Sequence, residues 1–236
     1  MTDNNVYLQP AYILAQRKYR ETSLIIDLLT RDFGRISLLA KGVRKAKSKT
    51  AGLLQAFNPL KVSYFGKSDL KILSHVEMSG VHESFQGIGL YCGFYVNELI
   101  TCFLHQYDPH PEVFDYYEAC IAKLITNANI EETLRFFELD LMTACGYGLI
   151  LDYDTNNTQI NSELIYQFDL EQGAIAASDG LISGATLIAL NNRQKLTNQS
   201  LLEAKLLMRK MIATYMNGKP LKSRAVINQI MQHLEK

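Results

Sequence analysis

Positively charged residues are nearly missing from the middle of this chain of 236 residues. Residues 81–192 hold 2 Lys and Arg against 16 Asp and Glu, whereas residues 1–80 hold 13 against 6 and residues 193–224 hold 8 against 1. The formal net charge of +0 therefore hides two basic segments separated by an acidic one. Because clustered Lys and Arg concentrate phosphates, this asymmetry predicts a polyanionic partner for both basic segments.

The sequence also lacks a long apolar run and a secretion signal. No stretch approaches the roughly 18 apolar residues that cross a bilayer, and the first residues lack the basic and apolar regions of a signal peptide. We therefore expect a cytoplasmic protein without membrane contact. Its 47% apolar and 20% charged residues are ordinary for a globular chain of one large domain or two small ones.

The cysteines are too dispersed to suggest a metal site or a disulfide framework. Cys92, Cys102, Cys120 and Cys145 lie 10, 18 and 25 residues apart in segments with helical patterning. A zinc site or a compact disulfide set normally brings cysteines closer together in the sequence. We expect reduced thiols, no structural metal and no cofactor.

Motifs of catalysis are missing as well, so we expect no enzyme. Gly66-Lys67-Ser68 lacks the glycine that a phosphate-binding loop requires five residues earlier, where Lys61 stands. No Ser or Cys nucleophile stands in a known catalytic pattern. A carboxylate cluster at Asp152, Asp154 and Glu163 leaves a metal-dependent nuclease open as an alternative, although a solvated acidic loop explains the same residues.

Strand patterning fills the first 80 residues. Apolar residues alternate with polar ones between turn signals, as in half-buried strands. The expected strands are Tyr7–Lys18, Leu24–Thr30, Ile36–Lys41, Leu60–Tyr64 and Leu70–Val76. Five short strands with the longest connection between the third and fourth match an OB-fold barrel. A small SH3-like barrel would give a similar pattern.

Beyond about residue 84 the apolar spacing becomes helical. Asn129 is an expected N-cap, with Glu132 as its capping-box partner. A polar segment at 149–183 contains an expected hairpin, Tyr166–Ile175. The other expected helices are Leu90–His105, Val113–Ile125, 129–146, 184–191, Gln199–Met216 and Arg224–Leu234. The fold class is therefore α+β: a five-stranded OB-fold domain at 1–80 and a mainly helical domain at 81–236, with an insertion at 149–183.

The basic segments are the candidate nucleic-acid contacts. The densest one carries five cations in nine residues: Lys41, Arg44, Lys45, Lys47 and Lys49. A solvated loop is the alternative explanation, but strand ends and turns add cations that can converge with it on one side of a barrel: Arg17, Lys18, Arg20, Arg31 and Arg35. Grooves of this kind combine cations with aromatic rings that stack bases. The candidate rings are Tyr19, Phe33, Tyr64 and Phe65.

A second basic set lies near the C-terminus. Its members are Lys205, Arg209, Lys210, Lys219, Lys222 and Arg224. Lys205 and Arg209 are four residues apart, so they share one helical face. The set predicts an auxiliary DNA surface, although cations also suit the negative end of a helix dipole.

Several runs resemble the RecO family of bacterial DNA repair proteins. In the N-terminal part these are Glu21-Thr-Ser-Leu-Ile25, Gly34-Arg-Ile-Ser-Leu-Leu-Ala-Lys-Gly-Val-Arg44 and Leu54-Gln-Ala-Phe-Asn-Pro-Leu60. Further on they are Leu90-Tyr-Cys-Gly-Phe-Tyr-Val-Asn-Glu-Leu99, Leu134-Arg-Phe-Phe-Glu-Leu139, Gly146-Tyr-Gly148 and Gly218-Lys-Pro-Leu-Lys-Ser-Arg224. The runs occur in the expected order and span nearly the whole chain.

The resemblance implies an OB-fold joined to a helical domain and a recombination mediator without catalytic residues. Such proteins bind single- and double-stranded DNA and anneal complementary strands coated by the single-stranded DNA-binding protein SSB. They act with RecR to load RecA, and participation of RecF stays open. The resemblance further implies a monomer that associates with the nucleoid during repair. An RNA-binding OB-fold protein would share the basic barrel and is the alternative function.

The resemblance also implies a binding site for the acidic, phenylalanine-ended tail of SSB on the helical domain. Arg135 is the expected cation, and the apolar residues beside it are Leu134, Phe137 and Leu139. The alternative role of Arg135 is an ion pair with Glu131, four residues earlier.

One departure from the family pattern concerns zinc. Many members carry a four-cysteine zinc module after the Gly-Tyr-Gly turn, but residues 149–183 contain no cysteine. The chain therefore resembles the zinc-free branch, in which packing alone stabilises the hairpin.

Overall fold

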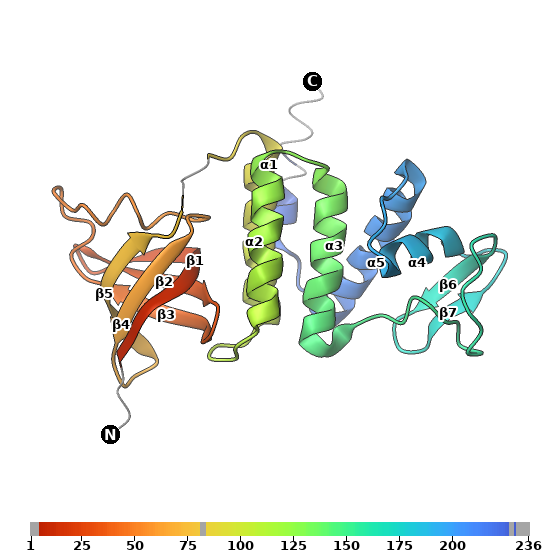
Figure 1. Ribbon diagram of the computed structural model, residues 1–236, viewed down its shortest axis with the longest axis horizontal. Coiled ribbons are helices and arrows are strands. Elements are labelled where there is room, and N and C mark those ends of the chain that lie inside the picture. Colours follow the sequence, from red (N-terminus) through yellow and green to blue (C-terminus); the bar gives the residue numbers. More distant parts are fainter. Residues whose placement is uncertain (1–4, 81–83, 227–228, 230–236) are drawn as a thin grey trace. The chain divides into compact units, whose positions relative to one another are not determined.

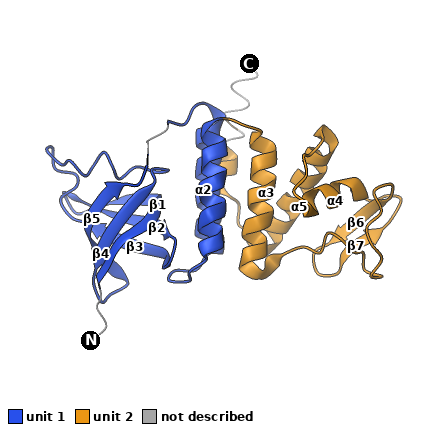
Figure 2. Cartoon of the chain, viewed as in Figure 1, with its two compact units in different colours: residues 1–126 blue, residues 127–236 orange. Residues whose placement is uncertain are grey.

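The computed structural model describes residues 5–80, 84–226 and 229 (Figure 1). The chain divides into two compact units, Met1–Thr126 and Asn127–Lys236 (Figure 2). No helix among the described residues has the length and apolar character that crossing a membrane requires.

The first unit begins with a closed barrel of five strands, as expected. These are β1 (Asn5–Tyr19), β2 (Ser23–Thr30), β3 (Gly34–Ala40), β4 (Leu60–Phe65) and β5 (Leu70–Met78). Their order around the barrel is β1-β2-β3-β5-β4, with a parallel β3–β5 pair and antiparallel pairs elsewhere. This crossover connectivity is that of an OB-fold and excludes a simple up-and-down arrangement.

Alternate residues of each strand fill the barrel. Ile26 and Leu28 of β2 face the interior together with Ile36 and Leu38 of β3, and each is at most 1% exposed. The residues between them lie on the other face of the strands, because side chains alternate along a strand. The period-2 pattern is thus the physical cause of the barrel core.

Two helices belong to the same unit as the barrel. They are α1 (Ile88–Phe103) and α2 (Pro111–Ile125). Asn97 of α1 donates from Nδ2 to the Leu14 carbonyl at 3.0 Å, next to a register shift between Ile13 and Ala15 of β1. The Tyr117 hydroxyl of α2 donates to Asn97 Oδ1 at 2.7 Å. The compact unit therefore extends past residue 80, where the strand pattern ends, and a nucleic-acid-binding domain at 1–80 stays a proposal.

The second unit combines helices with a small sheet. Its helices are α3 (Ile130–Met142), α4 (Gly184–Asn191) and α5 (Asn198–Tyr215), and a π-helical turn, Thr143–Tyr147, follows α3. Its strands β6 (Ile165–Asp169), β7 (Gly173–Ala176) and β8 (Ile182–Ser183) pair in the order β7-β6-β8. The expected hairpin is confirmed by the β6–β7 pair. The helix expected at Arg224–Leu234 lies largely outside the described residues.

Two helices of this unit are capped by hydroxyl side chains. Ser183 accepts from the Thr186 amide before α4, and Thr197 accepts from the Ser200 amide before α5. The capping box expected at Asn129 is wrong: Asn129 has a positive φ of 45° and no side-chain cap bond. Glu132 instead accepts from the Leu196 amide at 2.7 Å. A long-range contact has thus replaced the local one.

Candidate nucleic-acid interface

The expected cations of the barrel lie at both ends of the β2–β3 hairpin. Leu24 pairs with Ala40 at one end and Thr30 with Gly34 at the other. The ladder has seven residue pairs from one end to the other, so the ends are six steps apart, about 20 Å at roughly 3.3 Å per residue. We call the first end the basic end, made of the β1–β2 turn (20–22), the strand residues beside it and the β3–β4 connection (41–59). Its cations are Arg17, Lys18, Arg20, Lys41, Arg44, Lys45, Lys47 and Lys49.

The β3–β4 connection is anchored at the basic end. The Arg44 amide donates to the Thr22 carbonyl at 2.9 Å, and Arg44 Nη1 donates to the Arg20 carbonyl at 3.2 Å. Val43 and Leu54 are buried in the barrel core. The two apolar side chains hold the segment on the barrel and the Arg44 bonds hold it on the β1–β2 turn, while Lys41, Arg44, Lys45 and Lys47 stay exposed. The cluster of cations that the sequence predicted thus lies on a connection that is packed against the barrel.

A groove of about 580 Å³ runs along this surface. Tyr19 at the end of β1 and Arg20 of the β1–β2 turn line it together with Lys41 and Lys45 of the connection. The Arg20 guanidinium carbon lies 5.3 Å from the centroid of the Tyr19 ring. Lys41 also lines a smaller groove of about 190 Å³ beside β5 residues 73–76. Cations that meet phosphates next to a ring that stacks a base are the components of a single-strand groove.

The other aromatic candidates are not at this groove. Tyr64 is 2% exposed and belongs to the barrel core, so its expected role as a base-stacking platform is wrong. Phe33 contacts the Tyr64 ring at 6.3 Å between centroids, in the β2–β3 turn at the opposite end of the hairpin. Phe65 is 42% exposed and pairs with Asn5 and Ile72. Only Tyr19 therefore joins the cations of the basic end.

Arg31 and Arg35 lie at the other end of the hairpin and contact the helices of the first unit. Arg31 Nη2 is 3.1 Å from Asp115 Oδ2 of α2. Arg35 Nη1 donates to the carbonyls of Thr101 and Leu104 at 2.6 and 2.7 Å. Burial lowers the pKa of Arg35, and Asp27 partly opposes this. The expected convergence of all the barrel cations on one side is therefore wrong, because Arg31 and Arg35 lie at the opposite end of the hairpin, where they bind Asp115 of α2 and carbonyls near the end of α1.

Two cations of the second basic set, Lys205 and Lys210, make contacts within the second unit. Lys205 Nζ is 3.1 Å from Glu131 Oε1 of α3, and Lys210 Nζ donates to the Phe168 carbonyl at 2.9 Å. Arg209, Lys219 and Lys222 are exposed, and Arg224 is half-buried.

The residues expected to bind the SSB tail are buried. Leu134, Phe137 and Leu139 are at most 9% exposed, and the Arg135 side chain is 9% exposed. Arg135 Nη2 lies 2.6 Å from Glu138 Oε1, three residues later on α3. The alternative ion pair with Glu131 is wrong, since Glu131 pairs with Lys205. Arg135 is thus a buried, paired cation in this conformation.

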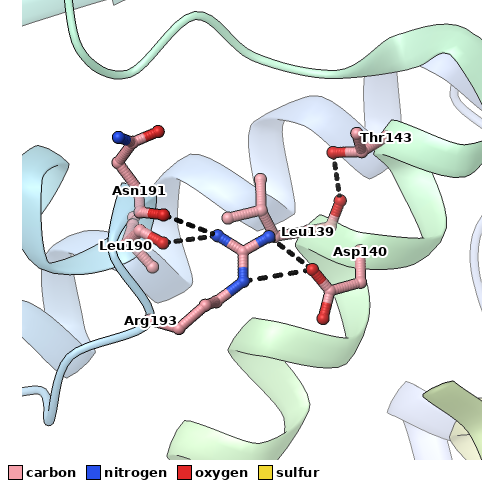
Figure 3. A network of polar contacts seen from close by, with 6 residues as sticks. All are labelled: Leu139, Asp140, Thr143, Leu190, Asn191 and Arg193. Carbon is pink, nitrogen blue, oxygen red and sulfur yellow. Dashed lines mark hydrogen bonds and ion pairs between the residues drawn. The ribbon is translucent and has the colours of Figure 1, made fainter.

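Sequence reasoning missed Arg193, which joins α3 to the end of α4 (Figure 3). Its guanidinium donates to Asp140, and Nη1 also donates to the Leu190 carbonyl at 2.6 Å. The Thr143 hydroxyl, at the start of the π-helical turn after α3, donates to the Leu139 carbonyl at 2.8 Å (Figure 3). A cation just after the last turn of a helix interacts favourably with the helix dipole. The position of Arg193 after the helix expected at 184–191 was thus the signal in the sequence for its role.

The acidic residues behind the nuclease alternative do not form a recognised metal site. Among the described residues, no three His, Cys, Asp or Glu side chains group closely enough to hold a metal ion. Asp154 Oδ1 accepts from the amides of Asn156 and Thr158, which closes a turn.

An OB-type barrel with a cationic, aromatic groove, followed by helices, defines a class of nucleic-acid-binding architecture. Family models for the N-terminal and C-terminal parts of recombination protein O match residues 2–81 and 85–225. The chain belongs to the RecO family of DNA repair and recombination proteins.

Similar relatives are each called DNA repair protein RecO. The protein of Methylococcus capsulatus is 42% identical over 94% of this chain and 93% of the relative. That of Nitrosospira multiformis is 37% identical over 95% and 96%, and that of Alkalilimnicola ehrlichii is 38% identical over 98% and 94%. The similarity thus spans both units of the chain.

Proposed function

We propose that the chain is a recombination mediator that binds single- and double-stranded DNA at the basic end and anneals complementary strands. The observation that carries this proposal is the groove lined by Arg20, Lys41 and Lys45, in which the Arg20 guanidinium carbon lies 5.3 Å from the centroid of the Tyr19 ring. Membership of the RecO family supports a role in DNA repair. In this role the protein acts on SSB-coated strands and, with RecR, promotes RecA loading, with RecF and RecA as indirect partners. It works as a monomer, in the cytoplasm and at the nucleoid.

Annealing by such a protein requires no bond chemistry. Two DNA strands repel each other through their phosphates, and cations that bind both strands reduce this repulsion. The basic end is the first cationic surface, and the exposed cations among residues 209–224 are the second. The protein therefore needs no catalytic residue, cofactor or metal.

The test of this function is an annealing assay on complementary DNA strands, with and without bound SSB. We expect the variant with Arg20→Ala, Lys41→Ala and Lys45→Ala to lose strand binding and annealing together. A Lys61→Ala, Lys67→Ala variant removes two cations outside the groove and serves as the control. Unchanged annealing by the groove variant would contradict the proposal.

Two further measurements test the two alternative functions. An RNA-binding protein would bind a matched RNA strand more tightly than the DNA strand, because an RNA-specific site uses the 2′-hydroxyl. A metal-dependent nuclease would shorten an end-labelled strand when Mg²⁺ is added. We expect neither result.

The proposal includes a binding site for the SSB tail around Arg135. Because Arg135 is buried, this site requires a local change of structure. The tail reaches the guanidinium only if the Arg135–Glu138 pair opens. Arg135→Glu would place two carboxylates together and destabilise the fold, so Arg135→Gln is the sharper test.

Two variants distinguish recognition from folding. We expect Arg135→Gln to abolish binding of the isolated SSB tail peptide, whereas Glu138→Gln preserves or strengthens it by releasing the cation. Equal loss of peptide binding and of thermal stability in both variants would show that the pair is only structural. If Arg135→Gln binds the peptide as tightly as the wild type, the cations of residues 205–224 become the next candidates.

A further inference from the structure

A further groove, which lies within the second unit, is not explained by DNA binding. It lies between α5 and the sheet formed by β6, β7 and β8, and has a volume of about 420 Å³. We call it the hairpin–α5 groove. This volume falls in the range of ligand-binding pockets, about 300–1,000 Å³.

Exposed aliphatic side chains line the hairpin–α5 groove. Leu181 precedes β8, Leu206 belongs to α5 and Ile175 belongs to β7. They are 77%, 55% and 37% exposed. Adjacent exposed apolar side chains around a hollow mark a surface that binds another apolar group. The groove therefore offers apolar contacts to an occupant with its own aliphatic or aromatic side chains.

Three carboxylates fix the charge of the groove: Asp169, Asp179 and Glu203. Hydrogen bonds from the amides of Gln172 and Glu171 lower the pKa of Asp169. Burial raises the pKa of Glu203, but hydrogen bonds from Thr186, Ser183 and Gln199 together lower it. Both groups are therefore ionised at neutral pH.

Lys210 is the only cation among the described residues that line the groove, and its Nζ is held by the Phe168 carbonyl at 2.9 Å. One cation against three carboxylates leaves the lining negative. Phosphates and acidic peptides are therefore repelled, so this groove suits neither DNA nor an acidic tail.

We propose that the hairpin–α5 groove binds a short segment of a partner protein in which leucine-like side chains alternate with lysine or arginine. The apolar side chains contact Ile175, Leu181 and Leu206, and the cations meet Asp169, Asp179 and Glu203. These carboxylates stand on separate elements, β6, the β7–β8 connection and α5, so several cations along one peptide are needed to meet them. Charge complementarity selects this peptide over DNA and over acidic partners.

The experiment is a selection of random dodecapeptides displayed on phage against the full-length protein. We expect the enriched peptides to combine leucine, isoleucine or phenylalanine with lysine or arginine. The best peptide is then synthesised with a fluorophore, and its affinity is measured by fluorescence anisotropy.

Two leucines on one helix provide a matched comparison. Leu206→Ser removes an apolar contact inside the groove and should weaken the selected peptide about tenfold or more. Leu202→Ser changes a side chain that is 63% exposed on the same helix but does not line the groove, so it should bind like the wild type. Asp179→Asn should reduce the salt dependence of binding. Thermal unfolding of all three variants verifies that they fold.

Three outcomes would overturn the assignment: enrichment of acidic peptides, no enrichment at all, or equal affinity of the selected peptide for Leu206→Ser and the wild type. Leu181→Ser repeats the test from the other wall of the groove. Preserved affinity in that variant, too, would place the peptide elsewhere.

Discussion

Asn97 is a single buried side chain that stabilises the bulge in β1 and the packing of both helices of the first unit. Its amide donates to the carbonyl of Leu14, and its oxygen accepts from the Tyr117 hydroxyl. The side chain is buried, so water does not replace these bonds when they are removed. The residue therefore supports the fold on which the candidate interface rests.

We expect Asn97→Ala to lower the free energy of unfolding by roughly 1–3 kcal/mol, because it leaves buried polar groups of Leu14 and Tyr117 unsatisfied. Chemical denaturation monitored by circular dichroism gives this value. Thr101→Ala, one turn later on α1, removes a bond to a carbonyl of the same helix at an exposed position and should change stability by only about 0.5 kcal/mol. Equal effects of the two variants would show that the Asn97 contacts do not stabilise the fold.

Strands and helices were predictable because their apolar periodicity is a local property. The same periodicity also placed Tyr64 on the face of Leu60 and Val62, inside the barrel, although its ring suggested base stacking.

 Val62 and Tyr64 are two residues apart on β4, so their side chains lie on the same face of the strand. This spacing, and not the aromatic ring, was the signal for the position of Tyr64.

Long-range partners were not predictable in the same way. Glu131 lies four residues before Arg135, yet it pairs with Lys205, which is 74 residues away. Likewise, Arg35 belongs to β3 but binds carbonyls near the end of α1. No local sequence pattern shows which distant residue pairs with a cation. The density of Lys and Arg in the sequence therefore overestimated the number of cations that can contact DNA.

At the scale of elements, the β2–β3 turn packs against the connection between α1 and α2. Gly34 has a φ of +64°, and a Cβ at this position would overlap the backbone carbonyl of Asp108. The Tyr107 amide donates to the Arg35 carbonyl at 3.0 Å in the same contact. Backbone therefore meets backbone at this point, which leaves no space for a side chain.

We expect Gly34→Ala to lower the free energy of unfolding by about 2–4 kcal/mol, because backbone strain adds to a steric clash. Gly42→Ala is the matched control. Gly42 has a φ of +70°, but its nearest neighbouring atoms belong to the Lys45 side chain, at 3.6 Å or more. It should therefore cost only the strain of about 1–2 kcal/mol. Equal losses in thermal or chemical unfolding would contradict the proposed clash.

At the scale of the whole molecule, the purified protein should contain no stoichiometric zinc. Structural zinc needs four converging ligands of the Cys or His type. Cys92 and Cys120 are buried, Cys102 is exposed and Cys145 is half-buried, and residues 149–183 contain no cysteine. Elemental analysis should give far less than one zinc per chain, and thermal unfolding should be unaffected by a chelator. About one tightly held zinc per chain would overturn this prediction.

The uneven charge of the molecule leads to a prediction about salt. Although the formal net charge is +0, the basic end concentrates Lys41, Arg44, Lys45, Lys47 and Lys49 on one connection. If these cations neutralise about four phosphates of a single strand, the logarithm of affinity should fall with the logarithm of salt concentration at a slope of roughly −3. Replacing all five by alanine should flatten this slope, as measured by fluorescence anisotropy of a labelled strand.

A pairwise comparison separates local phosphate contacts from an effect of overall charge. Lys47→Ala with Lys49→Ala and Lys61→Ala with Lys67→Ala each remove two positive charges from the barrel. Only the first pair changes the β3–β4 connection, so it alone should reduce the slope, by up to about 1.4. If both pairs change the slope equally, DNA responds to the charge of the whole barrel. An unchanged slope in the variant with all five replacements would show that the phosphates bind elsewhere.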